Sequence, residues 1–564
     1  MSGWRFWGGR PRTPSAFAPG TFDYGRWIIR RINERRPEYT ATQERGLFAL
    51  LTLVLDQPVE FFDELAWSVQ AQDFANFEWI IVDLGATSTL RLRLKGLHGD
   101  PRVKVLRAEA PRGLVQGWRL ALDSASYRYA LPLEASDRLY PDALRIVATF
   151  LQQHNYPPVV YSDEDQLLPD GQPTNPFCKP DWDPLLLYSG GYTTRLAVLD
   201  RLLALKTGAF TEDAANGCAI WDACCRFVAQ GYEPDHLPEI LYSRRVSEPR
   251  CGMLHPLKHA GSASHVLRNH LRRQRMAEKL NVRANPLPGQ AGSWRLAWQR
   301  TSRDTGIPVV CPMGSLAELH KQLNKYSDDG LVAIQSANTQ TLTADWADEA
   351  RAVLAALPDA VCVGGCILDQ QQRVISAGEF FGLDGLVASP FRGWDYGDTR
   401  GHGRLLCQQT VSAPSRDFFV AEVGFLKDLL ESKGLDLSLS LLHAWVGAEA
   451  RAHGYRVAFT PHLLVRLIGD ADELRPSAEE TWRFLKAHWQ QLLDDPTWSR
   501  FLSLQRHRAF ALASPAERAA VLSGTLCHLA GILPLEEQLT ELANQYPSRM
   551  HRPIEKRRSF RHAA

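Results

Sequence analysis

Short apolar runs alternate with amphipathic segments from residue 46 onward. Continuous apolar runs are typical of buried strands, and apolar residues at three- and four-residue spacing are typical of helices that cover a sheet. The pattern predicts helices over residues 61–72 and 113–125, between four strands that span residues 47–55, 78–84, 102–108 and 127–135. This alternation indicates a mostly parallel, doubly wound α/β sheet.

The alternation returns near residue 307, after a polar and basic stretch that includes HVLRNHLRRQR. It predicts strands over residues 307–312, 331–336 and 361–368 and a helix over residues 346–356. We therefore expect a helical lead (1–45), an α/β module (46–250), a helical connector (251–300), a second α/β module (301–470) and a helical C-terminal region (471–564) with a basic tail.

The helical lead contains one amphipathic segment, YGRWIIRRINERR (residues 24–36). A basic amphipathic helix can pack on a neighbouring module or lie in the headgroup region of an anionic membrane. We favour packing on the first module, and keep peripheral contact with the cytoplasmic face of the inner membrane as the alternative.

Composition narrows the partners and the location. With 64 Lys and Arg against 63 Asp and Glu, the net charge is +1, which does not predict a nucleic-acid partner. Apolar runs reach only about ten residues, against the roughly 20 that a membrane-spanning helix needs, and no secretory signal precedes the first module. The ten cysteines lack zinc-site spacing, so we expect buried, reduced thiols in a cytoplasmic protein.

Carboxylates follow two of the predicted strands. Asp83 lies at the end of the second strand, and Glu134 lies at the end of the fourth, with Asp137 just after it. Ligands of open α/β sheets bind beyond the carboxyl ends of the strands. The sequence therefore predicts a site lined by carboxylates at this edge.

Several stretches resemble glycosyltransferase family 2, in the long, two-module form found among bacterial polysaccharide and O-antigen proteins. In the first module they are SVQAQDF before WIIVD, then LYPDAL, YSDEDQLLPDG (161–171) and KPDWDPLLL (179–187). In the second module they are ADWADEARAVL, SAGEFFG, SPFRG and GYRVAFTP, in the family's order. The interval between residues 312 and 331 is shorter than in a full module. The resemblance implies a GT-A module followed by a truncated GT-A-like module.

The resemblance also implies an activity. Family members transfer a sugar from a nucleotide-sugar donor, here a UDP- or dTDP-sugar, to a glycan or lipid-linked acceptor. The expected setting is the synthesis of bacterial surface polysaccharide, such as the O-antigen of lipopolysaccharide, together with partner glycosyltransferases.

A divalent cation, Mg²⁺ or Mn²⁺, is implied as the group that neutralises the departing diphosphate. The family's Asp-x-Asp pattern corresponds to Glu134, Ala135 and Ser136. The expected metal ligands are therefore Glu134, Asp137, Asp163 and Asp165.

The donor site can be carried over in the same way. Asp83 corresponds to the acid that holds the base or ribose, and Gly85 to the turn after it. The other expected donor-binding residues are Asp163, Glu164, Asp165, Lys179, Asp181, Trp182 and Arg245. Without the resemblance, residues 163–165 can equally be a solvated acidic turn.

The family's general base lies in a Glu/Gln-Asp-x-Asp stretch that corresponds to residues 219–222. Ile220 stands at the base position and cannot accept a proton. The remaining candidates for the catalytic base are Asp222, Asp213 and Glu212.

The second module keeps less of the family's chemistry. Ser336–Thr339 replace its metal acids, and Leu442–Trp445 replace its base region, so this module is expected to be non-catalytic. The losses at Ser136 and Ile220 also support an alternative, a pseudo-glycosyltransferase that acts as a scaffold or partner subunit. A third alternative, a sugar-binding module, rests on the 16 Trp residues.

Overall fold

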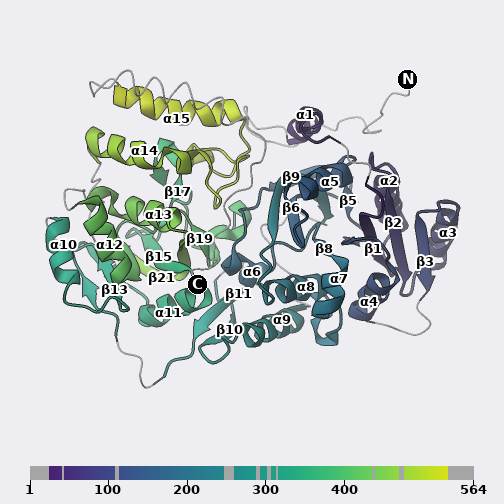
Figure 1. The fold of residues 1–564 in the computed structure, drawn as a ribbon, viewed down its shortest axis with the longest axis horizontal. Coiled ribbons are helices and arrows are strands. Elements are labelled where there is room, and N and C mark those ends of the chain that lie inside the picture. Colours follow the sequence, from purple (N-terminus) through teal and green to yellow (C-terminus); the bar gives the residue numbers. More distant parts are fainter. Residues whose placement is uncertain are drawn as a thin grey trace.

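The computed structural model describes residues 24–40, 44–107, 113–246, 259–287, 292–301, 306–312, 315–434, 439–468 and 476–530. Two α/β modules lie side by side, the first in purple and blue and the second in green (Figure 1). This arrangement confirms the predicted fold class.

A nine-stranded sheet forms the first module, in the order β3-β2-β1-β4-β8-β6-β9-β5, with β7 paired to β6. Its strands are β1 (Phe48–Val54), β2 (Phe77–Asp83), β3 (Val103–Arg107), β4 (Tyr129–Glu134), β5 (Arg138–Leu139), β6 (Val159–Leu167), β7 (Pro173–Phe177), β8 (Val198–Asp200) and β9 (Asp235–Arg245). The helices around it are α2 (Val59–Gln70), α3 (Ser88–Gly96), α4 (Leu114–Ser124), α5 (Ala143–Gln153), α6 (Pro184–Gly190), α7 (Arg201–Thr207) and α8 (Ala219–Val228).

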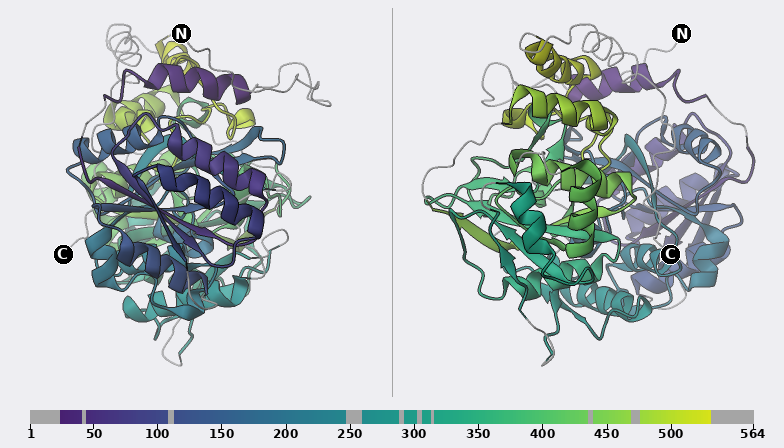
Figure 2. Two further views of the ribbon diagram at one scale, coloured as in Figure 1. Left: turned by 90° about the vertical axis from the view of Figure 1, so that its right-hand side faces the viewer. Right: turned by 60° about the vertical axis from the view of Figure 1, so that its left-hand side comes forward.

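Strand β1 lies inside this sheet, and its sequence is almost continuously apolar. All seven residues of β1 are buried, because helices cover both faces of the parallel strands. In the left view of Figure 2, the strands of this sheet lie between helices on either side. One of them, α2, turns Phe62, Leu65 and Val69 into the core at helical spacing.

The second module has an eight-stranded sheet in the order β12-β13-β20-β15-β21-β14, with β16 paired to β15 and β19 to β21. Its strands are β12 (Val309–Val310), β13 (Leu331–Gln335), β14 (Thr339–Thr341), β15 (Ala360–Leu368), β16 (Val374–Ala377), β19 (Gln409–Val411), β20 (Phe418–Glu422) and β21 (Arg456–Leu467). Its helices are α10 (Leu316–Leu323), α11 (Trp346–Ala356), α12 (Val423–Lys433) and α13 (Leu442–Ala452), and a small hairpin joins β17 (Phe380–Phe381) to β18 (Val387–Ala388).

The two sheets share one topology. The run β1-β4-β8-β6-β9-β5 recurs as β12-β13-β20-β15-β21-β14. At every junction the pair is parallel or antiparallel in the same sense in both modules. Within the described ranges, the second module lacks counterparts of α2, β2, α3 and β3, and it has no α-helix in the place of the short α6. The truncation predicted from residues 312–331 is therefore the loss of this half of the sheet.

The connector between the modules differs from its prediction. It contains α9 (Ala260–Arg273), as expected, but continues into an antiparallel hairpin of β10 (Leu280–Ala284) and β11 (Trp294–Trp298). Helices α14 (Ala478–Leu493) and α15 (Pro515–Ala530) follow the second module and lie at the top left in Figure 1. The basic tail lies outside the described residues.

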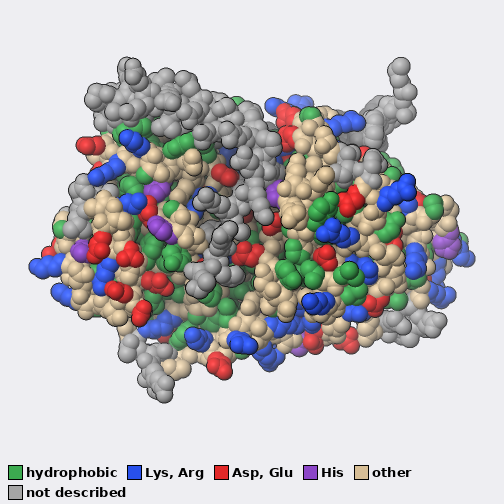
Figure 3. Space-filling model, in the orientation of Figure 1, with side chains coloured by type: hydrophobic (Ala, Val, Ile, Leu, Met, Phe, Trp, Pro, Cys, Tyr) green, Lys and Arg blue, Asp and Glu red, His purple; other side chains and the backbone are tan. Residues whose placement is uncertain are grey.

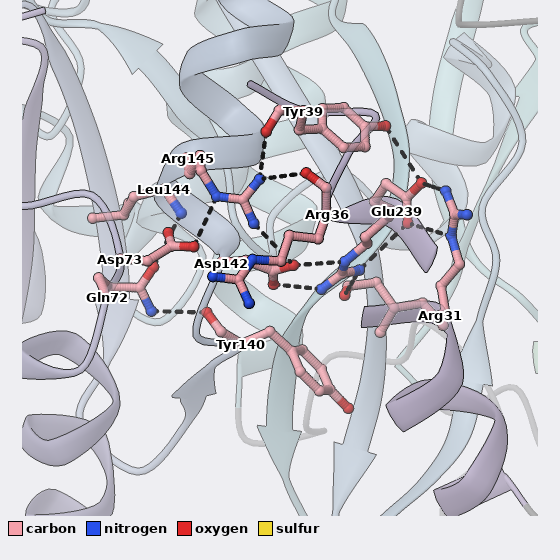
Figure 4. Close-up of polar contacts among 12 residues, drawn as sticks. Arg31, Arg36, Tyr39, Gln72, Asp73, Tyr140, Asp142, Leu144, Arg145 and Glu239 are labelled. Atoms are coloured by element: carbon pink, nitrogen blue, oxygen red, sulfur yellow. Dashed lines mark hydrogen bonds and ion pairs between the residues drawn. The ribbon is translucent and has the colours of Figure 1, made fainter. Parts of the chain in front are cut away.

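The N-terminal helix α1 (Tyr24–Arg35) packs against the first module and the C-terminal segment. Arg35 bonds Asp142 at 2.6 and 2.9 Å, and Trp27 meets the ring of Phe501 edge-on with centroids 5.6 Å apart. Figure 4 shows the buried polar contacts on this side of the module. The structure thus supports the packed alternative for this helix. No helix among the described residues is long and apolar enough to span a membrane.

The KPDWDP stretch lies at the junction of the modules. Asp183 caps the N-terminus of α6 by accepting from Leu186 N at 3.1 Å, and also accepts from Thr410 N of the second module at 2.7 Å. The backbone N–H of Asp181 donates to Pro496 O at 2.8 Å. These contacts tie the stretch to the segments that follow the first module.

We expect Asp183→Ala to lower the free energy of unfolding by about 1–3 kcal/mol more than Asp200→Ala. Asp200 caps α7 by accepting from Leu203 N, so its loss removes a cap alone. Asp183 is fully buried, and its loss also leaves Thr410 N without its acceptor. Urea denaturation of both variants measures the difference, and equal losses would show that the bond between the modules contributes nothing.

Candidate functional site

The carboxyl ends of the parallel strands bring two predicted site residues to one edge. Strand β1 pairs in parallel with β2 on one side and β4 on the other. Val54 is in register with Asp83, and Leu53 with Glu134. Asp83 and Glu134 therefore flank the end of β1, where ligands of such sheets bind.

Asp83 is built into the turn after β2. Its Oδ1 accepts from Gly85 N at 3.0 Å and Ala86 N at 2.7 Å, and its Oδ2 accepts from Arg91 at 3.1 Å. Burial alone would raise the pKa of Asp83, but these backbone donors and the Arg91 guanidinium lower it. Gly85 has φ +143°, and a Cβ there would meet nothing within 4 Å. The turn is open around a charged, fixed carboxylate.

At the end of β4, an arginine joins two acids. Arg195 Nη1 lies 3.2 Å from Glu134 Oε1 and 4.0 Å from Asp137 Oδ2. Burial would lower the pKa of Arg195, but Glu134 and Asp137 raise it, so the guanidinium stays charged. Asp137 also accepts from Tyr242 Oη at 2.7 Å and Arg245 N at 2.9 Å. Burial raises the pKa of Asp137 to about 6.

Strands β6 and β9 add a second group of charges. Glu164 lies 2.9 Å from Lys179 Nζ and 3.7 Å from Arg244 Nε. It is in register with Tyr242, whose hydroxyl bonds Asp137, so these side chains share one face of the sheet. Burial would raise the pKa of Glu164, but Lys179 and Arg244 lower it.

Asp163 and Asp165 face the opposite side of β6 from Glu164. Asp165 accepts from Tyr24 Oη of α1 and from Tyr140 Oη, both at 2.6 Å. Both acids are fully buried, and burial raises the pKa of Asp165 to about 6. The solvated-turn alternative is therefore wrong, because these acids belong to the core beneath α1.

Asp163 belongs to a buried chain of charges. His236 Nε2 lies 2.9 Å from Asp163 Oδ1, and His236 Nδ1 lies 2.8 Å from Asp181 Oδ1. Burial would lower the pKa of His236, but the two carboxylates raise it. Asp163 also accepts from the backbone of Lys179 at 2.8 Å. This chain links β6, β9 and the KPDWDP stretch.

The expected metal ligands are thus divided between two faces. Glu134 and Asp137 face Arg195, whereas Asp163 and Asp165 face His236 and α1. The described residues contain no group of three or more His, Cys, Asp or Glu side chains arranged to hold a metal ion. Because Ser136 supplies no carboxylate and a guanidinium already pairs with the two remaining acids, this donor set does not fit Mg²⁺ or Mn²⁺.

Two other expected donor-binding residues lie elsewhere. Asp181 and Trp182 are held at the junction of the modules, and Trp182 belongs to the apolar core. Arg245 stays near the carboxyl edge, where it donates to Ser136 O at 2.9 Å and Glu64 Oε2 at 2.6 Å. The Arg245 side chain thus holds the backbone of the loop after β4 in place.

The position expected for the general base is apolar and packed. Ile220 is buried in the core of the first module. Asp222 is 1% exposed and is bound by Arg226 at 2.6 Å and Arg273 at 3.0 Å. Asp222 therefore acts as an anchor between α8 and α9.

Asp213 is the better placed of the remaining base candidates. It is exposed, and it contacts Gln116 Nε2 at 3.2 Å in the first turn of α4. Because α4 follows β3 in the chain, this turn lies at the carboxyl edge, on the same side as Asp83. Glu212, next to it, lies 3.4 Å from His265 and 4.0 Å from Arg226, pointing toward α8 and α9.

The second module has no equivalent site within its described residues. It lacks a counterpart of β2 and so has nothing in place of Asp83. His443, at the base position, is 5% exposed and bonds Glu379 at 3.1 Å. His443 is thus a packed residue of α13.

Three residues of the site had no signal in the sequence. Arg195, Arg244 and Tyr242 come from segments without an acidic or glycine-rich motif, and Arg195 is 61 residues from its partner Glu134. Of the residues near them in the chain, the resemblance pointed only to Arg245.

Comparisons with known proteins give a family match for part of the first module. Residues 59–195 match the model of the family described as "Glycosyl transferase family 2". "Uncharacterized protein y4gI" of Sinorhizobium fredii (strain NBRC 101917 / NGR234) is 25% identical over 553 residues, covering 84% of this chain and 59% of that protein. "O-antigen biosynthesis protein RfbC" of Myxococcus xanthus is 31% identical over 246 residues, covering 42% of this chain and 19% of that protein. The chain thus spans less than two thirds of the length of either relative.

Among solved structures, S. aureus TarS (residues 1–349) is similar at 15% identity with a TM-score of 0.32, over 41% of this chain and 69% of that one. The same protein in complex with UDP-GlcNAc gives a TM-score of 0.31.

The family match begins at α2 and ends at Arg195, so it contains Asp83, Glu134, Asp137 and Glu164. These residues form the carboxyl edge described above. The first module of this chain is therefore a glycosyltransferase family 2 domain.

Proposed function

We propose that the first module transfers a sugar from a UDP- or dTDP-sugar to a glycan or lipid-linked acceptor in the synthesis of a bacterial surface polysaccharide. The observation that carries the proposal is the family match over the residues that bring Asp83 and Arg195 to one edge of the sheet. The printed name of the RfbC relative, an O-antigen biosynthesis protein, supports the choice of pathway.

In this proposal Asp83 holds the ribose or base. A carboxylate accepts hydrogen bonds from sugar hydroxyls, and the exposed Arg91 can move away from it at little cost. The cationic side chains beside Glu134 hold the diphosphate, since guanidinium groups bind phosphate oxygens with paired hydrogen bonds. Asp213 takes the proton of the acceptor hydroxyl, which requires an exposed carboxylate at the same edge.

The setting of the reaction is part of the proposal. A cytoplasmic enzyme that uses a lipid-linked acceptor would work at the inner face of the inner membrane, together with partner glycosyltransferases. The surface in Figure 3 has interspersed charges of both signs, which is compatible with peripheral contacts but does not favour any one of them.

A pseudo-glycosyltransferase is the second candidate. Specific observations favour it, namely the packed Ile220 and the tightly paired Asp222 in the region of the family's base. Under this alternative the first module would bind donors weakly or not at all, and would act as a scaffold for an intact enzyme. The two candidates differ in turnover, which the Asp213 variant described below tests.

Donor binding is tested by the thermal stability of the full chain with UDP and with dTDP. A ligand at 100 times its dissociation constant stabilises the folded state by about 2.7 kcal/mol, which raises the melting temperature by several degrees. We expect this rise in the wild type and in Asp123→Ala, an exposed helix acid paired with Arg119. We expect no rise in Asp83→Ala. If neither nucleotide shifts the wild type, the first module is not a donor-binding enzyme.

A further inference from the structure

The clearest departure from the family pattern is a guanidinium that pairs with the acids left from the metal motif. Arg195 reaches Glu134 at 3.2 Å and Asp137 at 4.0 Å. Ser136, between these acids in the chain, supplies no carboxylate. A cation of the protein itself thus already pairs with the two remaining carboxylates.

Arg195 is held in place yet open to a ligand. Its side chain is 23% exposed and that of Glu134 is 48% exposed, so one side of the ion pair meets solvent. Tyr242 fixes the other side, since its hydroxyl bonds Asp137 and also accepts from Glu134 N at 3.3 Å. The guanidinium is therefore preorganised at the surface of the site.

Two further cations lie on the same face. Arg244 and Lys179 flank Glu164. Arg195 acts on the same carboxylate, since its charge also lowers the pKa of Glu164. Arg244 Nε has no hydrogen-bond partner among the described residues. Burial lowers the pKa of Arg244, which an approaching anion would reverse. The face therefore carries the charge of two further cations and, at Arg244 Nε, a donor without a hydrogen-bond partner.

A divalent cation at Glu134 and Asp137 would have to displace Arg195 or lie against it. A metal ion bound to these carboxylates would lie next to the Arg195 guanidinium, and the two cations would repel each other. Two carboxylates also supply only part of the oxygen ligands that Mg²⁺ or Mn²⁺ requires. A guanidinium can neutralise the diphosphate in place of a metal ion, because it carries a positive charge and paired N–H donors.

We propose that this domain binds the nucleoside diphosphate without a divalent cation, and that Arg195, assisted by Arg244, takes the place of the metal. The inference rests on the proposed function, since it concerns the same site. Arg195 contacts the phosphates and is in that sense a binding residue.

Calorimetric titration of UDP and dTDP into the full chain, once with EDTA and once with Mn²⁺, tests this inference. For the wild type we expect dissociation constants that agree within about threefold in the two conditions. In EDTA, Arg195→Ala should weaken binding at least tenfold, and Arg195→Lys should lie between, because Lys keeps the charge without the paired donors. Arg119→Ala is the matched control, since Arg119 is a partly exposed arginine on α4, and this variant should bind like the wild type.

Arg195→Ala also frees Glu134 and Asp137, so Mn²⁺ should tighten nucleotide binding to this variant more than to the wild type. Circular dichroism and melting curves confirm that each variant is folded, and Arg195→Gln replaces Ala if that variant unfolds. Two results would overturn the inference and leave the proposed function intact. One is a wild-type dissociation constant at least tenfold lower with Mn²⁺ than with EDTA. The other is an unchanged dissociation constant in EDTA when Arg195 is replaced. Absence of binding in both conditions would instead overturn the proposed function, and this inference with it.

Discussion

Replacing Glu239 with Ala is expected to lower the free energy of unfolding by about 3–5 kcal/mol, because it leaves several arginines without their shared acid in the interior. Glu239 lies on β9 and its side chain is fully buried. It binds Arg31 of α1, accepting from Nε at 3.2 Å, and lies 3.3 Å from Arg35 and 2.8 Å from Arg500. Figure 4 shows Arg31 and Tyr39 converging on it.

This cluster joins three distant parts of the chain. Arg31 and Arg35 come from α1, Glu239 from the first module and Arg500 from the segment between α14 and α15. A truncated acid would leave the fully buried Arg35 with Asp142 and the backbone carbonyl of Ile240 as its hydrogen-bonding partners. The loss should therefore loosen α1 as well as lower the overall stability.

The same residue predicts a pH dependence. Burial alone would raise the pKa of Glu239, but Arg31, Arg500 and Arg35 lower it to about 2, below its ordinary 4.5. A lowered pKa gives stability that is complete above pH 4.5 and is lost as the pH falls toward 2. The difference in stability between wild type and Glu239→Ala should therefore shrink over this range.

Urea denaturation of both proteins at pH 7 and at steps down to pH 3 measures both effects. Glu38→Ala is the matched control, because Glu38 also pairs with Arg31 but its side chain is 46% exposed. Its loss should cost less than about 1 kcal/mol. An equally small cost for Glu239→Ala would show that the arginines find other partners.

Asp213→Asn is expected to lower the rate of sugar transfer by about 10²–10⁴-fold, the usual contribution of a general base. Asn keeps the shape and the contact with Gln116 but cannot accept the proton of the acceptor hydroxyl. Because Asp213 is exposed, the variant should fold and bind UDP like the wild type. The loss should thus appear in kcat rather than in donor affinity.

Two neighbouring acids separate this role from a structural one. Glu212→Gln should leave kcat within a few-fold of the wild type. Asp222→Asn should mainly lower stability, since Asp222 is buried between Arg226 and Arg273. Transfer of radiolabelled sugar to membrane-extracted acceptor gives the rates. Unchanged turnover in Asp213→Asn would remove it as the base, and no turnover in the wild type would favour the scaffold alternative.

The buried elements could be predicted from the sequence, because burial requires apolar residues at regular positions and these form a clear pattern. The strand over residues 361–368 is found as Ala360–Leu368, and the helix over residues 346–356 has the same bounds in the structure. The hairpin in the connector was missed although Leu280, Val282 and Ala284 alternate with polar residues, because the preceding helix dominated the pattern.

The site could be predicted only in part. Strand order brings Asp83 and Glu134 together, and the pattern of parallel strands was enough to expect it. Alternation along β6 was enough to put Asp163 and Asp165 on one face, but not to say which face. Their partners come from α1 and β9, and only the packing of these elements decides the direction.

The contact of Arg195 with Glu134 also could not be predicted from the sequence. Its partner Glu134 lies 61 residues earlier in the chain, so no local spacing of residues predicts the pair. The loss of an acid at Ser136 was visible in the sequence, whereas the cation that pairs with its neighbours was not.

The most direct test of the central claim is an experimental structure of the full chain with UDP bound. The account predicts the nucleoside beside Asp83 and the diphosphate within hydrogen-bonding distance of the Arg195 guanidinium, at the carboxyl edge of β1, β2 and β4. A nucleotide bound at another face, or a diphosphate held away from Arg195, would contradict it.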